Sequence, residues 1–374
     1  MKSNSTKKKK RKNSLRASTV IGRTALVFFT IIFILLFTLA ALCYTLLTGP
    51  SPAMRDRVVL SAMQASATKW LPGLFLDDAL VDEICEKSAN VQEEVIAMGA
   101  FKADPEEEKT QETPADEWDS AIDGMIYKTY SGATYKAYML IVKDPSRVYV
   151  GTSSDYKSGQ IGARIFDIVE RENAIAAING GEFEDINGHG TGNTPVGLTY
   201  SKGSCVWNDG LRRTFIGFDN NNVLHAVESI TKAEADALGM RDAVSFQTGN
   251  VLITNDNENV TLYYSENNVG MSQRTAIGQR ADGAVILLVT DGRSASSLGA
   301  TKNDLIDLLV SEGAVVAGML DGGSSAMMYY RDYYTKYGIA ASGLDEYQRQ
   351  GLTNKYKAFT KPRHIPTYFL VKPE

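Results

Sequence analysis

An apolar stretch near the N-terminus constrains this chain more than any other feature. Residues 25–47 are 23 amino acids without a charge, mostly Leu, Phe, Ile, Ala and Thr. A helix of this length can span a hydrocarbon core of about 30 Å. The sequence therefore predicts a transmembrane anchor. A cleaved signal peptide is the competing interpretation, although its apolar region is usually about 7 to 15 residues long.

The charges around this stretch predict its orientation. Residues 1–24 carry nine Lys and Arg and no acidic residue, whereas only Arg55 and Arg57 follow the stretch closely. The positive-inside rule then places a basic tail, residues 1–24, in the cytoplasm and the rest of the chain outside the cell membrane. Without the tail the chain has a net charge of −14, which argues against a nucleic-acid partner.

Composition divides the chain after the anchor into three parts. Residues 51–101 repeat apolar side chains at helical spacing and predict a helical, membrane-proximal stalk. Residues 102–121 are acidic and poor in aliphatic side chains, as solvated linkers are. Residues 122–374 mix predicted strands with helices, which favours a single mixed α/β (α+β) domain. Cys85 and Cys205 could form a bridge outside the cytoplasm, but two isolated thiols are the simpler interpretation.

Short β-rich segments and two helical segments are predicted in this last part. The expected strands are 135–142, 147–150, 174–178, 196–200, 214–218, 251–254 and 284–290, and the expected helices are 161–173 and 302–312.

A further buried strand ends in polar and flexible residues. Residues 316–320 are small and apolar, and they are followed by Asp321, Gly322, Gly323, Ser324 and Ser325. Glycines let the backbone turn sharply and approach a ligand closely. The run therefore predicts a carboxylate held at a rigid strand end. A plain Asp-Gly turn between two strands is the alternative.

The same order of elements occurs twice along the chain. A predicted helix, a buried strand, a polar residue and two glycines end at Asn179, Gly180 and Gly181, and again at Asp321 and its glycines. We expect two pseudo-symmetric halves whose Asn179 and Asp321 loops meet at one site. A separation above about 15 Å would exclude a shared small-ligand pocket. Chance similarity between Gly-Gly turns is the alternative.

Two more polar clusters accompany predicted strands. Arg274 and Thr275 form one, Asp291 and Arg293 form the other, and Glu182 follows the first Gly-Gly pair. Charged and amide side chains beside glycines at strand ends are what a small-ligand site requires.

Taken in this order, the motifs resemble the phosphodiester glycosidase family. The resemblance runs from about residue 135 to residue 371. It includes Pro195 to Leu198, Lys202-Gly203, Arg274 to Gly278, Asp291-Gly292, Leu320 to Gly323 and Arg363. Two positions depart from the family pattern: Ser324 replaces a frequent third glycine, and Glu182 replaces an aromatic or small residue.

The resemblance implies an enzyme that cuts a sugar from the phosphate on its anomeric carbon. Such a reaction passes through an oxocarbenium-like transition state, for which two carboxylates are needed. We expect Asp321 and Asp291 to be this pair, with Glu182 as the third candidate. Arginines bind phosphate bidentately, so Arg274 is expected to act with Arg293 or Arg363. The remaining expected substrate contacts are Asn179, Gly180, Gly181, Thr275, Gly322, Gly323, Ser324 and Ser325.

Several simpler roles remain open for these residues. Arg274 could be a buried structural arginine, and His189 is more readily a loop residue than a base. The three histidines lack metal-ligand spacing, which argues against a zinc site, whereas Asp and Asn loops could hold Ca²⁺ or Mg²⁺. The pairs Tyr329-Tyr330 and Tyr333-Tyr334 could stack on a sugar or simply pack.

The expected substrate is a glycan or sugar phosphate of the cell envelope or of an exopolysaccharide, because an anchored domain would face outward. A metal-dependent phosphodiesterase and a non-catalytic glycan-binding module are the two alternatives.

Overall fold

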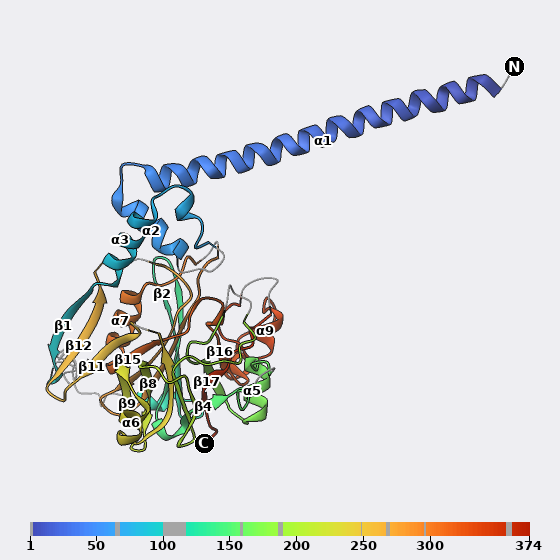
Figure 1. The fold of residues 1–374 in the computed structure, drawn as a ribbon. Helices are drawn as coiled ribbons and strands as arrows, with labels where there is room; N and C mark the ends of the chain where they lie inside the picture. The colour runs from blue at the N-terminus through green and yellow to red at the C-terminus, as the bar shows by residue number, and fades with distance from the viewer. Residues whose placement is uncertain are drawn as a thin grey trace, which may run out of the picture.

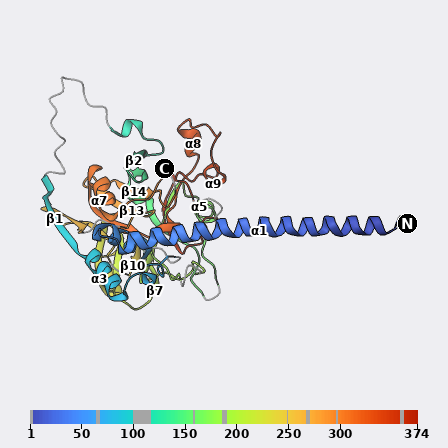
Figure 2. The same ribbon diagram turned by 90° about the horizontal axis from the view of Figure 1, so that it is seen from above.

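The computed structural model describes residues 3–63, 68–99, 117–157, 160–185, 190–247, 249–266, 270–294, 297–356 and 361–374. A long helix, α1 (Ser3–Thr48), projects from a body built mainly of β-strands (Figure 1). Seen from above, it extends away from one side of that body (Figure 2).

Helix α1 contains the predicted anchor. Its apolar part, Gly22–Thr48, has 27 residues and is long enough to cross a membrane. The hydroxyl of Thr30 donates to the carbonyl of Leu26 one turn earlier, and that of Thr38 donates to Ile34 in the same way. These hydroxyls are thereby satisfied within the helix, as an apolar surrounding requires.

Two short helices pack against the end of α1. Helix α2 (Pro52–Met63) and helix α3 (Asp78–Ala89) are separated by the 3₁₀ turn η1 (Pro72–Leu74). Leu47 of α1 is completely buried in a small apolar cluster with α2 and α3. The end of the apolar helix is therefore part of a folded unit.

The prediction of helix over residues 51–101 is wrong for its last part. Residues Val91–Ala97 form strand β1, which pairs along its full length with β12 (Asn259–Ser265). Pairing with a distant strand has overridden the local helical pattern. Most of the predicted linker, residues 102–116, lies outside the described residues, and Glu117–Ser120 form a 3₁₀ turn, η2.

The largest sheet has eight antiparallel strands in the order β1-β12-β11-β15-β13-β14-β3-β2. Its remaining members are β11 (Val251–Asn255), β15 (Ala314–Leu320), β13 (Thr275–Arg280), β14 (Val285–Thr290), β3 (Lys136–Val142) and β2 (Met125–Ser131). Strand β15, predicted from its apolar run, lies between β11 and β13 and is almost entirely buried.

Two smaller sheets complete the domain. The five-stranded sheet has the order β7 (Ser204–Asn208), β6 (Leu198–Ser201), β10 (Met240–Phe246), β8 (Arg213–Asp219) and β9 (Leu224–Ile230). The four-stranded sheet has the order β16 (Met328–Tyr330), β5 (Ala176–Asn179), β17 (Thr367–Val371) and β4 (Val148–Thr152).

The three sheets bury one common core. Leu287 of the large sheet, Phe246 of the five-stranded sheet and Phe369 of the four-stranded sheet belong to the same apolar cluster. The sheets approach closely at Gly318, where an added Cβ would lie 2.2 Å from the side chain of Ile216. The mixed, single-domain architecture predicted from the sequence is confirmed.

Helices cover the outer faces of the sheets. Helix α7 (Lys302–Ser311) packs on the large sheet, and α5 (Ile165–Arg171) packs on β5. The shorter helices are α6 (Lys232–Ala237), α8 (Tyr333–Lys336) and α9 (Glu346–Arg349). Helices α8 and α9 lie on the opposite side of the domain from β1 (Figures 1 and 2). All three cysteines are free thiols.

Candidate active site

The two polar strand ends predicted to meet do so. Asn179, at the end of β5, donates from its side-chain amide to the backbone carbonyl of Asp321, at the end of β15, over 2.6 Å. Its amide oxygen accepts hydrogen bonds from the Thr275 hydroxyl at 2.7 Å and from the Met327 N–H at 3.1 Å. Asn179 and Thr275 are both fully buried. They therefore hold the site together.

The glycines beside these residues are required by close backbone packing. A Cβ on Gly180 would lie 2.5 Å from the hydroxyl of Thr367, and one on Gly322 would lie 2.8 Å from the carbonyl of Gln273. Gly323 has φ +61°, a conformation that L residues adopt only with strain. Gly181 donates its N–H to the hydroxyl of Thr367. The turn at Asp321 is thus held on both sides.

A cavity of about 380 Å³ opens at this turn, which is large enough for a small ligand. Charged side chains of both signs line it: two carboxylates, Glu182 and Asp321, and two guanidinium groups, Arg274 and Arg293. The other lining residues are Phe246, Gln247, Asn250, Ser272, Met319, Leu320, Gly322 and Gly323.

Asp321 is the most perturbed carboxyl of the cavity. Its pKa is raised to about 6, mainly by burial and also by the charge of Glu182, although the Ser325 hydroxyl, Arg363 and the Gly322 N–H act to lower it. The Gly322 N–H donates to the Asp321 carboxylate at 2.9 Å. A carboxyl with a pKa near 6 is able to carry a proton close to neutral pH.

Glu182 lies in the same cavity with a pKa that burial also raises. Its carboxylate accepts a hydrogen bond from the Gln247 N–H at 2.7 Å, and Arg213 favours the charged form. Two neighbouring carboxyls that disfavour simultaneous ionisation tend to separate into a proton donor and a charged base. The structure therefore pairs Asp321 with Glu182, the third of the predicted carboxylates.

Arg274 combines a structural role with a place in the cavity. Its guanidinium donates to the carbonyl of Gly270 at 2.6 Å and to that of Ala300 at 3.4 Å, so the structural role left open by the sequence is supported. Burial, followed by the positive charge of Arg293, lowers the pKa of Arg274 to about 10. Arg274 remains charged at neutral pH, and two mutually repelling cations make the cavity suited to an anion.

Arg363 lies at the edge of the same loop. One of its nitrogens donates to the Ser324 hydroxyl at 3.3 Å, another pairs with Asp185 at 2.5 Å, and the guanidinium stacks over the Phe183 ring at 5.0 Å. It does not line the cavity itself, but its charge acts on Asp321.

Asp291 is placed elsewhere. Its carboxylate accepts hydrogen bonds from the Tyr138 hydroxyl at 2.7 Å and from the Lys355 N–H at 3.2 Å. It is buried and does not line the cavity that contains Asp321. Burial raises its pKa. The structure thus does not bring the two aspartates predicted as a pair into one cavity.

Other sequence predictions are placed as follows. Tyr330 and Tyr333 pack into the core, whereas Tyr329 lines a second cavity. His189 lies outside the described residues. Of the Asp and Asn loops considered for Ca²⁺ or Mg²⁺, the one at Asp256 forms a turn in which its carboxylate accepts from the backbone N–H groups of Glu258 and Asn259. Within the described part of the chain, no three His, Cys, Asp or Glu side chains are grouped to hold a metal.

Four cavity residues outside the strand that ends at Leu320 were not predicted from the sequence. Phe246 is the last residue of β10, Gln247 follows it, Asn250 precedes β11, and Ser272 lies shortly before β13. Asn250 exchanges two hydrogen bonds with the backbone of Met319 and so fixes the wall beside Asp321. For Gln247 and Asn250, a polar residue directly beside a strand was the available signal.

Comparisons with known proteins show relatives in sequence and in fold. A sequence profile described as phosphodiester glycosidase matches residues 172–372. The SPbeta prophage-derived uncharacterized protein YomE of Bacillus subtilis (strain 168) is 28% identical over 210 residues, which cover 55% of this chain and 30% of that protein. The match therefore spans less than a third of that relative.

One solved structure shares the fold, and a second aligns more weakly. The catalytic domain of zebrafish N-acetylglucosamine-1-phosphodiester alpha-N-acetylglucosaminidase, auto-inhibited by its pro-peptide, aligns with a TM-score of 0.52 at 16% identity, covering 76% of this chain and 89% of that chain. A hypothetical protein from Synechocystis aligns with a TM-score of 0.47 at 12% identity, covering 66% of this chain and 62% of that chain.

Proposed function

The chain belongs to the phosphodiester glycosidase family, and from this premise we propose that it hydrolyses the bond between a sugar C1 atom and the oxygen of an attached phosphodiester. One observation carries the proposal: two carboxyls with raised pKa values share a cavity with two guanidinium groups. Carboxylates suit the oxocarbenium-like carbon, and arginines suit the phosphate.

In the proposed reaction, water adds to C1 while the C1–O bond to phosphate breaks. Glu182 takes a proton from the water, because Gln247 and Arg213 favour its charged form. Asp321 gives its proton to the departing phosphate oxygen, so that the products are a free sugar and a phosphomonoester. Phosphate is a good leaving group, which makes electrostatic stabilisation more important than proton donation.

Arg274 and Arg293 are proposed to hold the phosphate. Each carries a positive charge into a partly buried cavity, where charge-assisted hydrogen bonds are stronger than in water. A bound phosphate also relieves their mutual repulsion, so the same charges that lower the pKa of Arg274 favour substrate. Arg363 and Ser324 support the loop from outside the cavity.

A divalent cation remains a separate proposal. Mg²⁺ is often bound by one or two carboxylates together with substrate phosphate, and Asp321 with Glu182 would fit that description. Turnover measured in EDTA and after adding back Ca²⁺ or Mg²⁺ tests it. Full activity in EDTA would remove the cation from the mechanism.

We further propose that the enzyme acts outside the cell on an envelope glycan or exopolysaccharide. The apolar helix Gly22–Thr48 and the basic residues before it support a single-pass anchor with a cytoplasmic N-terminus. Protease added to intact cells should then digest the domain but spare the tail. Protection of the whole chain would contradict this orientation.

Isotope labelling tests the proposed bond cleavage. N-acetylglucosamine 1-(methyl phosphate) and glucose 1-(methyl phosphate), each in both anomeric forms, are incubated with the full chain in ¹⁸O-labelled water. Cleavage at C1 puts the label in the sugar, whereas a phosphodiesterase puts it in the phosphate. Glycan binding without turnover of any substrate would favour a non-catalytic module.

A further inference from the structure

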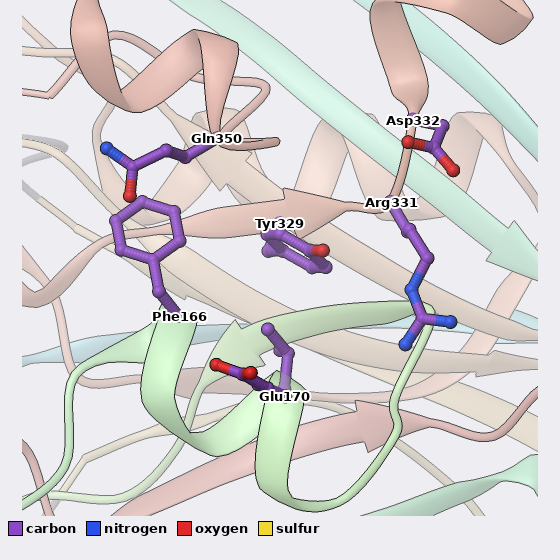
Figure 3. A pocket seen from close by; sticks show the side chains of 7 residues that line it. Phe166, Glu170, Tyr329, Arg331, Asp332 and Gln350 are labelled. Carbon is purple, nitrogen blue, oxygen red and sulfur yellow. The ribbon is translucent and has the colours of Figure 1, made fainter.

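A second cavity, of about 390 Å³, lies between α5, the end of β16 and the residue that follows α9 (Figure 3). Two aromatic rings shape it: Tyr329 lies at its centre and Phe166 beside it, below Gln350 (Figure 3). The two ring centroids are 6.4 Å apart in an edge-to-face arrangement. Val169 is a further apolar lining residue. The cavity thus offers an apolar base.

Planar polar side chains surround this base: Glu170, Arg331, Asp332 and Gln350. Arg331 is held in place, because one of its nitrogens donates to the side chain of Asn173 at 3.0 Å and to the carbonyl of Ala174 at 2.9 Å. Apolar rings with a few fixed planar polar groups suit a sugar ring, which has apolar C–H faces and hydroxyl edges.

The charges of the second cavity differ from those of the first. Two carboxylates, Glu170 and Asp332, accompany one guanidinium group, Arg331. The first cavity instead carries two arginines with its two carboxylates. A phosphate would meet net repulsion in the second cavity, so an uncharged sugar is the favoured occupant.

A row of aromatic residues connects the two cavities. The Phe166 ring stacks on Tyr347 at 6.2 Å, and Tyr347 meets Tyr356 at 6.1 Å. The Tyr356 hydroxyl donates to the carbonyl of Ser324 at 2.6 Å, directly after Gly323 of the first cavity. All three rings are partly exposed. This aromatic row, Phe166, Tyr347 and Tyr356, therefore extends from the second cavity to the loop that follows Asp321.

We propose that the second cavity and the aromatic row form an accessory carbohydrate-binding surface. It holds uncharged sugar units of a polymer while a glycosyl phosphodiester of the same polymer occupies the first cavity. The assignment of that polymer rests on the proposed function, whereas the binding of sugar does not. Simultaneous engagement of two sites raises the effective concentration of the reacting unit.

The binding test uses the full chain with Asp321→Asn, so that binding is measured independently of turnover in the first cavity. Cellopentaose and chitopentaose, two uncharged oligosaccharides, are titrated by calorimetry. At least one should bind, and Phe166→Ala with Tyr347→Ala should weaken it about tenfold, the effect of losing about 1.4 kcal/mol of ring contact. Tyr264→Ala, a partly exposed ring on β12 of the large sheet, is the matched control.

Absence of binding for both probes would overturn the proposal, and so would equal affinity in the double variant and the control. Thermal melting confirms that the double variant is folded. Should it unfold, the exposed Gln350→Ala takes its place with an expected loss of several-fold. In an enzyme with native Asp321, the double variant should lose kcat/KM on the polymer but not on a small glycosyl phosphodiester. If the native enzyme turned over neither substrate, the proposed function would be wrong. The proposed sugar binding would still stand, because calorimetry measures it separately.

Discussion

The side-chain amide of Asn179 donates a 2.6 Å hydrogen bond to the backbone carbonyl of Asp321, 142 residues later in the chain. The Asp321 N–H returns a bond to the carbonyl of Gly180 at 3.2 Å. Both backbone groups of Asp321 are therefore fixed by the loop after β5. Its side chain is left to face the cavity, where rigid positioning favours catalysis.

Exchanging the amide of Asn179 for a carboxylate should disrupt this arrangement. Asn179→Asp keeps the shape but replaces the donor toward Asp321 with an acceptor, in a completely buried position. We expect a loss of about 2–4 kcal/mol in the free energy of unfolding, because a buried polar group loses its partner. Chemical denaturation measures this loss. Thr275→Ser, which retains the hydroxyl, should cost far less, and equal stability of Asn179→Asp and the native chain would contradict the role.

The pH dependence of turnover should reflect the two carboxyls of the cavity. If Asp321 donates the proton, kcat/KM should fall as pH rises through about 6, its pKa in the free enzyme. It should also fall at lower pH, where Glu182 is protonated. Asp321→Asn should lower turnover by about 10²- to 10⁴-fold and remove the alkaline limb. An unchanged alkaline limb in this variant would exclude Asp321 as the donor.

The same carboxyl should cost the protein stability. Its folded pKa of about 6 exceeds the ordinary value, so the folded state binds a proton more tightly than the unfolded state. Stability is then lost as pH rises from about 4 to 6 and stays low above that. Asp321→Asn should therefore raise the free energy of unfolding by about 1–3 kcal/mol at neutral pH, with no gain below about pH 4. Denaturation at both pH values tests this, since a gain at low pH would point to another cause.

Apolar continuity explains why some strands were predictable from the sequence. Strand β15 is a run of apolar residues that is followed by a charge, and β14 is apolar up to its last residue, Thr290, and buried throughout. The resemblance to the family then placed Asp321 and Arg274 in one site. These features depend on short segments of sequence, which local patterns describe well.

Buried polar residues explain why strand β10 was not predicted from the sequence. Strand β10 contains Asp242 and Ser245, whose side chains accept hydrogen bonds from backbone N–H groups of Val150 and Leu198 on other strands. These two polar residues are buried because they bind distant segments, and they interrupt the apolar sequence pattern that is typical of a buried strand. Gln247 follows β10 and donates its N–H to the Glu182 carboxylate, and it was not predicted because β10 was not. Likewise, β1 depends on a partner strand far along the chain.

Two conservative substitutions should distinguish the carboxylate pairs. Glu182 lines the cavity, whereas Asp291 is held by Tyr138 and by the Lys355 N–H outside it. Glu182→Gln should therefore lower kcat by about 10²-fold or more, as expected for loss of a general base. Asp291→Asn should leave kcat within several-fold and mainly change thermal stability. Steady-state rates of both variants on one glycosyl phosphodiester test this prediction. A larger loss of kcat in Asp291→Asn than in Glu182→Gln would instead support the pair predicted from the sequence, Asp321 with Asp291.

Arg293 offers a direct test of phosphate binding. It has φ +51°, a left-handed conformation that Asn tolerates well, and it is exposed, so Arg293→Asn removes the charge without straining the backbone. Loss of a charge-assisted hydrogen bond of about 1.5–3 kcal/mol should weaken inhibition by inorganic phosphate about 10- to 100-fold and raise KM similarly. Arg212→Asn, an exposed arginine before β8, is the matched control and should change neither value. Equal inhibition of both variants by phosphate would show that Arg293 does not bind the phosphate, and Arg274 would then be its main partner.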